Sequence, residues 1–457
     1  MRISSGIFRD YDVRAVIPDE LDKEGAIRIG QAIAELFKPK IVAIGHDMRI
    51  SADEISGGLA EGILKQGADV IDLGLISTDM AYFAAGKYQF DLAMSVSASH
   101  NPSEYNGLKL VKKNAIAVSG KSGIYDLRDL AVSKKKIAPA QKKGKRIAKN
   151  IVDDYIKHCL GFVKEKKIKP FKVVIDAGNA MAGHLIPKFA PFLPIKVIPL
   201  YFKLDGSFPH HDPNPLKPEN VADLKKKVLA EKADFGMAFD GDADRIYFID
   251  EKARFVSGTI ITAVIAEALL KKHPGQTILY NAIVGRIVPE IIKKFGGKGI
   301  RVKVGHTLIK EAMRKKDALF AGEHSGHYYF RNNYYADSAF IAMLVCLELF
   351  SERNKPLSQI ISEFDKYPII PETNFEIKDK ESLMRKIEKI YQDKAEKIDW
   401  LDGATLWFND SFVNIRASNT QPLLRLNIEA DNQKALLLRK KEFTKIIVDL
   451  GAKPSQE

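Results

Sequence analysis

Three aspartates, Asp240, Asp242 and Asp244, alternate with small residues between two apolar stretches that are typical of buried strands. A short extended loop can turn all three carboxylates to one side, where they would repel one another unless a cation lay among them. Ligation by oxygen alone favours a hard ion such as Mg²⁺ over zinc. Arg245 follows at once, and its fixed positive charge could hold a phosphate beside the metal. An acidic turn in solvent is the alternative, which the apolar flanks disfavour.

A second stretch, residues 91–110, carries a candidate nucleophile. An apolar run that predicts a strand leads into Ser99 and His100, and Asn101-Pro102 then predicts a turn. A serine hydrolase pair is one interpretation, but neighbouring residues on a strand point in opposite directions, which makes direct pairing poor. We therefore expect Ser99 to accept and donate phosphoryl groups with help from the metal. An ordinary polar turn stays the alternative for this stretch taken alone.

With three further stretches, these two resemble the signatures of the α-D-phosphohexomutase family, most of all its bacterial phosphomannomutase/phosphoglucomutase branch. The five stretches occur in the family's order, at residues 8–14, 97–109, 240–245, 322–327 and 416–425. Five signatures in the right order are far more specific than any one of them. The resemblance covers nearly the full length of the chain.

The resemblance implies a catalytic centre built on Ser99, which would be a phosphoserine at rest. It also implies a hexose 1,6-bisphosphate as intermediate and activator. Mg²⁺ would be held by a phosphoserine oxygen of Ser99 and by the three aspartates, and Arg245 would neutralise the same phosphate. His100 and Lys109 lie close by along the chain. Lys109 is the candidate proton carrier if a crowded cationic site lowers its pKa.

Sugar and phosphate recognition are likewise implied by the resemblance. Glu323 and Ser325 would bind two sugar hydroxyls, and one carboxylate can accept from a neighbouring hydroxyl pair in either orientation of the substrate. A tight loop with two arginines would hold the non-reacting phosphate. The substrate-binding candidates are Tyr11, Arg14, His306, Glu323, Ser325, His327, Arg416, Ser418, Asn419, Thr420 and Arg425.

Composition restricts the class of protein. At 457 residues the chain predicts three or four domains, and 46% hydrophobic residues suffice for their cores. Two cysteines give no disulfide framework, and no signal peptide or long apolar run appears, so we expect a cytoplasmic protein without a membrane span. The net charge of +13 suits dianionic sugar phosphates. Nucleic acid is not expected, because the lysine runs of residues 133–149 lack aromatics and are typical of a solvated linker. The oligomeric state stays open.

The periodicity predicts an α/β protein. Apolar runs at 40–45, 172–177 and 276–284 predict strands, and 25–37, 183–190 and 287–295 predict helices. Residues 404–430 predict strands and turns between helices, which is typical of an α+β domain. The resemblance implies three similar mixed-sheet α/β domains and a C-terminal α+β domain around a central cleft. We expect these domains at residues 1–150, 151–255, 256–367 and 368–457.

Alternatives to mannose or glucose phosphates remain. A phosphoglucosamine mutase would usually have glutamine where His324 stands. A magnesium-dependent sugar phosphatase would make the first aspartate the nucleophile, but those hydrolases usually lack Asp244. A non-catalytic sugar-phosphate binder is the third alternative. Departures from the family pattern, among them Asp79 in place of proline, leave the preferred hexose open.

Overall fold

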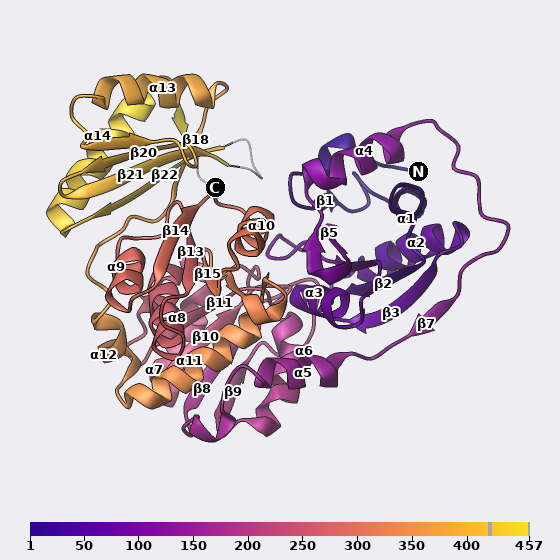
Figure 1. Cartoon of the computed structure of the whole chain (residues 1–457), viewed down its shortest axis with the longest axis horizontal. Coiled ribbons are helices and arrows are strands. Elements are labelled where there is room, and N and C mark those ends of the chain that lie inside the picture. The colour runs from indigo at the N-terminus through magenta and orange to yellow at the C-terminus, as the bar shows by residue number, and fades with distance from the viewer. Residues whose placement is uncertain (419–422, 456–457) are drawn as a thin grey trace.

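The computed structural model describes residues 1–418 and 423–455. Four sheets follow one another along the chain, and each has its own strands (Figure 1). The first three carry helices typical of α/β layers, and the fourth is antiparallel. The expectation of three related α/β domains and a C-terminal α+β domain is confirmed. The expected borders stay predictions.

The sheet of domain II has the simplest order. Strand β8 (Lys172–Asp176) lies parallel to β9 (Lys196–Leu200) and β10 (Phe235–Phe239). Strand β11 (Ile246–Asp250) returns antiparallel to β10, and β12 (Phe255–Val256) pairs with β11. Domain III repeats this order with β13 (Thr277–Asn281), β14 (Lys298–Val302), β15 (Phe320–Gly322), β16 (Tyr328–Phe330) and β17 (Ala336–Asp337).

Domain I uses the same order and extends it. Its strands are β1 (Val13–Val16), β2 (Ile41–His46), β3 (Asp69–Leu75), β4 (Leu92–Val96) and β5 (Tyr105–Lys112), with β6 (Ile116–Ala117) and β7 (Arg146–Ala148) added. In each domain one loop joins the parallel strand to its antiparallel partner. These loops are residues 97–104, 240–245 and 323–327, so three of the five sequence signatures occupy equivalent places in three sheets.

Helices cover the three α/β sheets. They are α1 (Lys23–Phe37), α2 (Ala52–Lys65), α3 (Thr78–Lys87), α4 (Ile124–Val132), α5 (Val152–Leu160), α6 (Met181–Phe189), α7 (Ala222–Glu231), α8 (Gly258–Lys272), α9 (Ile287–Lys294), α10 (His306–Lys316), α11 (Ala339–Arg353) and α12 (Leu357–Ser362). Short 3₁₀ helices span Ser5–Ile7, Lys113–Ala115, Gly120–Ser122, Glu165–Lys167, Ala190–Phe192, Pro218–Val221 and Arg331–Asn333. Side-chain caps start several helices, as Ser338 does when its hydroxyl accepts from the amide of Ile341.

Domain IV is antiparallel throughout. Its strands are β18 (Thr373–Glu376), β19 (Lys397–Asp399), β20 (Ala404–Phe408), β21 (Ser411–Ala417), β22 (Leu423–Ala430) and β23 (Lys453–Pro454). Helices α13 (Lys380–Tyr391) and α14 (Gln433–Asp449) lie over one face of the sheet (Figure 1). The turn expected at Asn419 and Thr420 lies outside the described residues.

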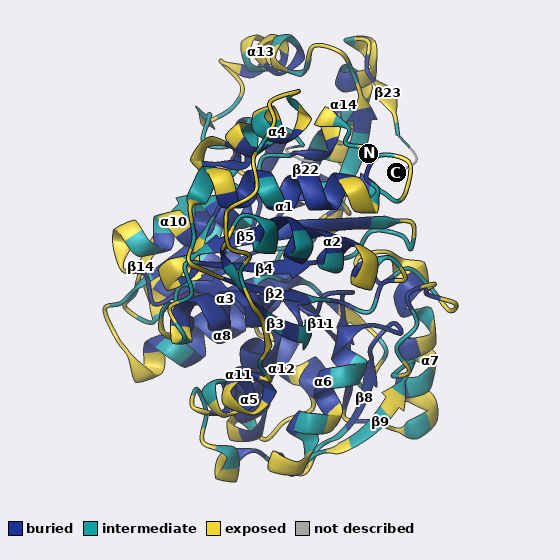
Figure 2. Ribbon diagram, turned by 90° about the vertical axis from the view of Figure 1, so that its right-hand side faces the viewer, coloured by how far each residue is buried: buried dark blue, intermediate teal, exposed yellow. Residues whose placement is uncertain are grey.

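One apolar core joins domains II and III and also includes α3 of domain I, and two smaller clusters lie within domains II and III. Helices α8 and α11 are apolar nearly all round because both are enclosed (Figure 2). Cys346 is buried in α11. Residues 133–149 are mostly exposed, but the structure adds a strand the sequence did not predict, because β7 pairs with the edge strand β3. Among the described residues, no helix is long and apolar enough to cross a membrane.

A buried carboxylate lies where three parts of the molecule meet. Asp79, at the start of α3, accepts hydrogen bonds from the hydroxyls of Ser77 and Tyr155. The Tyr155 hydroxyl from α5 is 3.2 Å from the hydroxyl of Ser338, which caps α11 of domain III. Burial raises the pKa of Asp79 to about 7, although the hydroxyls around it favour the charged form.

This geometry predicts that Asp79→Asn stabilises the protein above neutral pH. A carboxyl whose folded pKa lies above its unfolded value costs stability progressively as pH rises from about 4 to about 7. The variant removes that cost, so its thermal midpoint should exceed the wild type at pH 8 and converge with it near pH 4. Asp129→Asn, at an exposed position on α4, is the control and should give no pH-dependent gain. Equal pH profiles for wild type and Asp79→Asn would contradict the prediction.

Candidate active site

The loop between β10 and β11 places three carboxylates together. Asp240, Asp242 and Asp244 are all buried, and one oxygen from each lies within 4.8 Å of the others. The expected convergence of the three side chains is therefore present. A Cβ at Gly241 would lie 2.4 Å from the main-chain oxygen of Ser99, so glycine is what lets this loop approach the Ser99 loop so closely.

Cations and hydroxyls surround this cluster. The Lys109 ammonium lies 2.9 Å from Asp242 Oδ2 and 2.8 Å from Asp244 Oδ2, and Arg245 Nε is 3.0 Å from Asp240 Oδ2. Burial, and then the charges of the other two aspartates, raise the pKa of Asp240 to about 8. Burial alone would raise the pKa of Asp242 as well, but Lys109 and other donors hold it well below its usual range. The mutual repulsion of the carboxylates is thus only partly offset by the chain itself.

The donor set fits a hard divalent ion. Asp242 Oδ1 and Asp244 Oδ1 are buried and have no hydrogen-bond partner among the described residues. A buried carboxylate oxygen without a partner is costly, and a cation would satisfy both oxygens. All the offered ligands are oxygens, which is the preference of Mg²⁺. Asp240, Asp242 and Asp244 are therefore the residues that would hold it.

Ser99 lies directly beside this cluster. Its hydroxyl donates to Asp240 Oδ2 at 3.0 Å, and the Arg245 guanidinium donates to the same hydroxyl at 3.2 Å. One geometric expectation was wrong, because Ser99 Oγ is also 3.3 Å from His100 Nδ1. Ser99 has φ +53° rather than an extended conformation, and this left-handed backbone brings two neighbouring side chains to the same side.

His100 is a neutral imidazole in this setting. Burial, followed by the charges of Arg245 and Arg14, lowers its pKa well below 6.5. Its Nδ1 accepts a hydrogen bond from Arg245. Arg14 joins the same loop through a 2.5 Å hydrogen bond to the side chain of Asn101 and is itself paired with Asp12 at 2.8 Å. Both candidates therefore belong to the surroundings of Ser99.

Lys109 is buried, so the alternative of a surface lysine does not apply. The sequence analysis expected crowding by cations to lower the pKa of Lys109, and the structure gives the opposite direction. Burial does favour a lower pKa, but the carboxylates of Asp242 and Asp244 outweigh it and raise the pKa of Lys109 well above 10.5. A proton carried at this position is therefore held by the same carboxylates that form the candidate metal site.

The loop between β15 and β16 presents a second carboxylate site. Glu323 is buried, with one oxygen accepting from the Asn281 amide at 3.0 Å and the other from the Tyr329 hydroxyl. The carbonyl oxygen of Ser325 accepts from the hydroxyl of Tyr247. Tyr247 lies on β11, the strand that follows the metal loop, which is residues 240–245. This hydrogen bond ties the Glu323 loop to the metal loop across the boundary between domains II and III.

His327 makes a second link between these two loops. Its Nδ1 is 3.0 Å from Asp337 Oδ2 and 3.7 Å from Asp244 Oδ1. The Lys310 ammonium lies 2.8 Å from Asp337 Oδ1 and 3.3 Å from Nδ1 of His306. The sequence analysis missed Asp337 and Lys310. Asp337 precedes a helix and is easily taken for part of its cap, whereas the spacing of four between His306 and Lys310 was an available signal.

The remaining candidates lie toward domain IV. The rings of Tyr11 and His306 pack edge to face, with their centroids 5.5 Å apart. The amide of Val304, two residues before His306, donates to Asp402 of domain IV at 3.1 Å. Tyr11 therefore lies where domain I meets the domain III loop that contacts domain IV.

Two arginines of domain IV lie opposite each other on paired strands. Arg416 on β21 is in register with Arg425 on β22, and both approach Glu372, at 3.6 and 2.9 Å. Arg416 is also 3.9 Å from Asp402. The amide of Ser418 donates to the carbonyl of Leu423 at 2.8 Å. Asn419 and Thr420 lie outside the described residues, and Glu372 was missed by the sequence analysis.

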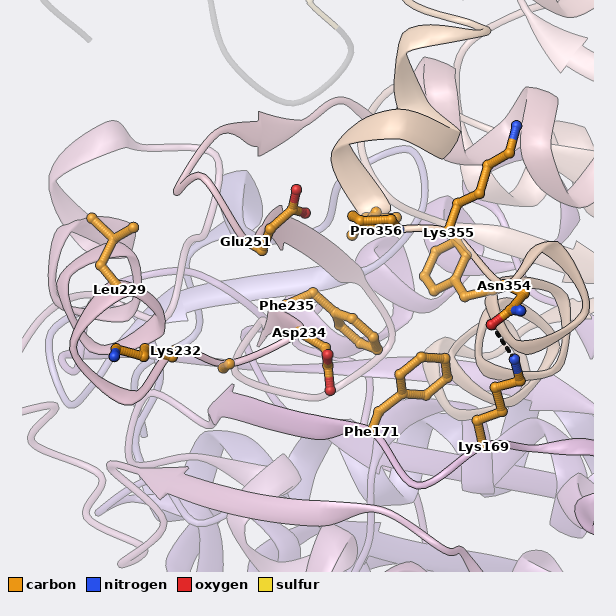
Figure 3. A pocket seen from close by; sticks show the side chains of 13 residues that line it. Lys169, Phe171, Leu229, Lys232, Asp234, Phe235, Glu251, Asn354, Lys355 and Pro356 are labelled. Atoms are coloured by element: carbon orange, nitrogen blue, oxygen red, sulfur yellow. Dashed lines mark hydrogen bonds between the residues drawn. The ribbon is translucent and has the colours of Figure 1, made fainter.

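A pocket of about 680 Å³ lies elsewhere. Its lining includes Phe171, Asp234 and Phe235, at the beginnings of β8 and β10 (Figure 3). The metal loop follows the C-terminal end of β10, whereas the pocket lies at the N-terminal end of this strand. The pocket and the carboxylate cluster are therefore at opposite ends of β10. At its rim the ammonium of Lys169 donates to the side chain of Asn354.

Four family models match the chain in order. They describe phosphoglucomutase/phosphomannomutase α/β/α domain I at residues 5–128, domain II at 153–254, domain III at 257–367 and the C-terminal domain at 372–446. The chain belongs to the phosphoglucomutase/phosphomannomutase family. It is thus a phosphohexomutase, an isomerase, and the family is generally magnesium-dependent.

Relatives of similar length support the assignment. A phosphomannomutase of Vibrio cholerae is 37% identical over 456 residues, which covers 97% of this chain and 98% of the relative. Proteins described as phosphohexose mutases in Xanthomonas campestris are 36% identical over 433 residues, covering 94% and 96%. A crystal structure of a family protein from Burkholderia thailandensis is 30% identical and superposes with a TM-score of 0.89, covering 99% of both chains.

The cluster predicts a metal dependence that Asp242→Asn should damage. The substitution keeps the shape but removes one ligand charge, so turnover should fall and excess Mg²⁺ should restore it only in part. Chelation should inactivate the wild type reversibly. Asp250→Asn is the matched control, because this buried aspartate lies at the far end of β11 and pairs with Arg254. It should lower stability without changing the Mg²⁺ concentration that gives half-maximal turnover. Wild-type turnover that survives exhaustive chelation would refute the metal site.

Proposed function

We propose that this phosphohexomutase transfers a phosphoryl group reversibly between the 1- and 6-positions of mannose and glucose phosphates. Ser99 carries the phosphoryl group as a phosphoserine, and a hexose 1,6-bisphosphate is the intermediate. The observation that carries the proposal is the position of the Ser99 hydroxyl, 3.0 Å from Asp240 and 3.2 Å from the guanidinium of Arg245. The names of the relatives, phosphomannomutases and phosphohexose mutases, support the substrate class.

In the first transfer, a free hydroxyl of the sugar phosphate attacks the phosphorus on Ser99. The bond from phosphorus to Ser99 Oγ breaks, a bond to the sugar oxygen forms, and the proton of the attacking hydroxyl must be taken up. Arg245 donates to Oγ and so stabilises the negative charge that develops on the leaving oxygen. Mg²⁺ on the three aspartates would neutralise charge on the transferring phosphoryl group.

We assign proton transfer to Lys109. Its ammonium is buried against the carboxylates of Asp242 and Asp244, next to the aspartate that accepts from Ser99. Because its pKa is raised, Lys109 starts protonated and gives its proton to the leaving oxygen of Ser99. The lysine, neutral at that point, then takes up the proton of the attacking hydroxyl and ends the transfer protonated again. His100 stays neutral and orients Arg245 by accepting from it.

Glu323 provides sugar recognition that works in both orientations. The intermediate must turn between its two transfers, so the same residues have to hold it both ways. A carboxylate fixed by Asn281 and Tyr329 can accept from a pair of neighbouring hydroxyls whichever end of the sugar faces Ser99. Mannose and glucose differ at the 2-hydroxyl, so a site that grips the 3- and 4-hydroxyls accepts both.

The second phosphate needs a separate anchor. Arg416 and Arg425 approach each other across β21 and β22 and share Glu372 as their partner. Two guanidiniums can bind one phosphate through charge-assisted hydrogen bonds. Together with the other residues of the same signature, they form the proposed site for the non-reacting phosphate.

Ser99→Ala tests the nucleophile. It removes the hydroxyl that accepts phosphate, so turnover should fall to background while the fold is kept. Intact-mass and peptide analysis of the wild type should show a phosphorylated fraction located at Ser99. Ser103→Ala, at a partly exposed serine of the same loop, is the matched control and should keep both turnover and phosphorylation. Retained turnover in Ser99→Ala would disprove the phosphoserine mechanism.

Glu323→Gln tests sugar recognition. Charge-assisted hydrogen bonds contribute roughly 1.5 to 3 kcal/mol each, so losing the charge should lower kcat/KM by about tenfold or more. The loss should appear in both reaction directions, because one carboxylate serves both orientations. Glu311→Gln, exposed on α10, is the control.

Steady-state kinetics with three phosphosugars tests the substrate class. Mannose 1-phosphate and glucose 1-phosphate should both be used, and glucosamine 1-phosphate should be much poorer. A clear preference for the amino sugar would assign the enzyme to the phosphoglucosamine branch instead.

A further inference from the structure

A buried arginine outside the five signatures holds the backbone of the Ser99 loop. Arg49 lies in the loop after β2, and its side chain is fully enclosed. Its guanidinium donates to four main-chain oxygens of this loop: Ser99 at 2.9 Å, Asn101 at 2.6 Å, Pro102 at 2.6 Å and Tyr105 at 2.9 Å. One rigid planar group thereby gathers carbonyls that span seven residues of the chain.

The guanidinium of Arg49 is also in contact with residues of domains I and II on its other sides. Asp47 accepts from the amide of Arg49 at 3.0 Å, and its other oxygen lies 3.3 Å from Arg49 Nε. The ring of Phe208, from domain II, lies against the guanidinium with its centroid 5.0 Å away. A Cβ at Gly206 would lie within 3 Å of the backbone of residues 48–50, so the two loops are in close contact. Arg49 is thus fixed in orientation from both sides.

This arrangement has a direct consequence for Ser99. A left-handed backbone at a serine is unfavourable without support, and Ser99 has φ +53°. The hydrogen bond from Arg49 to its carbonyl satisfies an oxygen that would otherwise be buried and unpaired if the loop kept its shape. The same conformation directs the hydroxyl of Ser99 to Asp240 and Arg245.

We propose that Arg49 is a positioning residue for phosphoryl transfer, which fixes the backbone at Ser99 so that its oxygen lies between the metal carboxylates and Arg245. The inference rests on the proposed phosphoserine role of Ser99. Arg49 acts through the loop backbone, because its hydrogen bond to Ser99 goes to the main-chain oxygen and not to the hydroxyl. Its loss should therefore slow the chemical step and leave binding of the sugar phosphate nearly unchanged.

The chain offers a close structural counterpart for comparison. Arg28, in α1, is also buried and donates to four main-chain oxygens, those of Leu130, Ala131, Ser133 and Lys135, at 2.6 to 3.3 Å. These carbonyls lie at the end of α4 and beyond it, and none of them belongs to a residue of the candidate site. Arg28 therefore has the same kind of contacts as Arg49 with a purely structural role.

The experiment compares Arg49→Lys with Arg28→Lys in the full-length enzyme with Mg²⁺. Both substitutions keep the charge and lose the planar fork, so both should lower the thermal midpoint. Arg49→Lys should lower kcat by about 100-fold, the effect of displacing a reacting group by about 1 Å, with little change in KM for glucose 1-phosphate. Ser99 should also take up phosphate from glucose 1,6-bisphosphate more slowly, as followed by intact mass. Arg28→Lys should keep the kcat and the phosphorylation rate of the wild type.

Two outcomes would overturn the inference. One is a kcat for Arg49→Lys equal to that of Arg28→Lys at matched folded protein; the other is a raised KM with unchanged kcat. If Arg49→Lys does not fold, Phe208→Leu replaces it, because that change removes the ring against the guanidinium. It should lower kcat and the phosphorylation rate in the same direction, and unchanged values would overturn the inference. Ser99→Ala is measured alongside, and its retained turnover would refute the phosphoserine role itself, independently of Arg49.

Discussion

Repulsion among three buried carboxylates is the constraint around which this structure is organised. Asp240, Asp242 and Asp244 cannot share a space of this size without opposite charge, and Lys109 and Arg245 supply only part of it. Such a cluster would attract a cation, and this candidate metal site lies beside the Ser99 hydroxyl. Two of the three aspartates each have a buried oxygen with no hydrogen-bond partner in the described part of the chain, which shows where the remaining demand for positive charge lies.

The three α/β domains each have a loop at the same place in the sheet, between a parallel strand and its antiparallel neighbour. In each α/β domain the loop after the parallel strand carries different residues, with the proposed nucleophile in domain I, the candidate metal carboxylates in domain II and the proposed sugar-binding carboxylate in domain III. Contacts between these loops then assemble them. Gly241 permits the close approach to Ser99, Tyr247 reaches the Ser325 carbonyl, and His327 lies between Asp244 and Asp337.

The cost of assembling charged groups in the interior is met by hydrogen bonds from neighbouring elements. Glu323 is satisfied by Asn281 and Tyr329, and Asp242 accepts from Thr78 at 2.5 Å. Buried polar groups of this kind are tolerated only when their partners are well placed, so these neighbours restrict how the domains fit together. Asp79 shows that burial still raises the pKa of a carboxyl whose two oxygens both accept hydrogen bonds.

The sequence by itself determined the elements and the chemistry of the separate loops. Alternating aspartates between apolar runs indicated a metal loop flanked by buried strands, and β10 and β11 lie there. Apolar periodicity likewise located the runs that became β4 and α1, since local patterning depends on residues close together in the chain. The resemblance supplied the order of the domains and the roles of the loops.

Only the tertiary structure decided which groups meet and how they titrate. Ser99 pairs with His100 because its backbone is left-handed, a conformation that strand periodicity does not reveal. Lys109 has a raised pKa because two carboxylates lie beside it in space. These carboxylates are more than 130 residues away along the chain. Arg49, Asp337 and Glu372 also act through contacts with other elements of the fold and carry no local pattern. Such interactions depend on distances through space, which residue types and spacing along one chain do not specify.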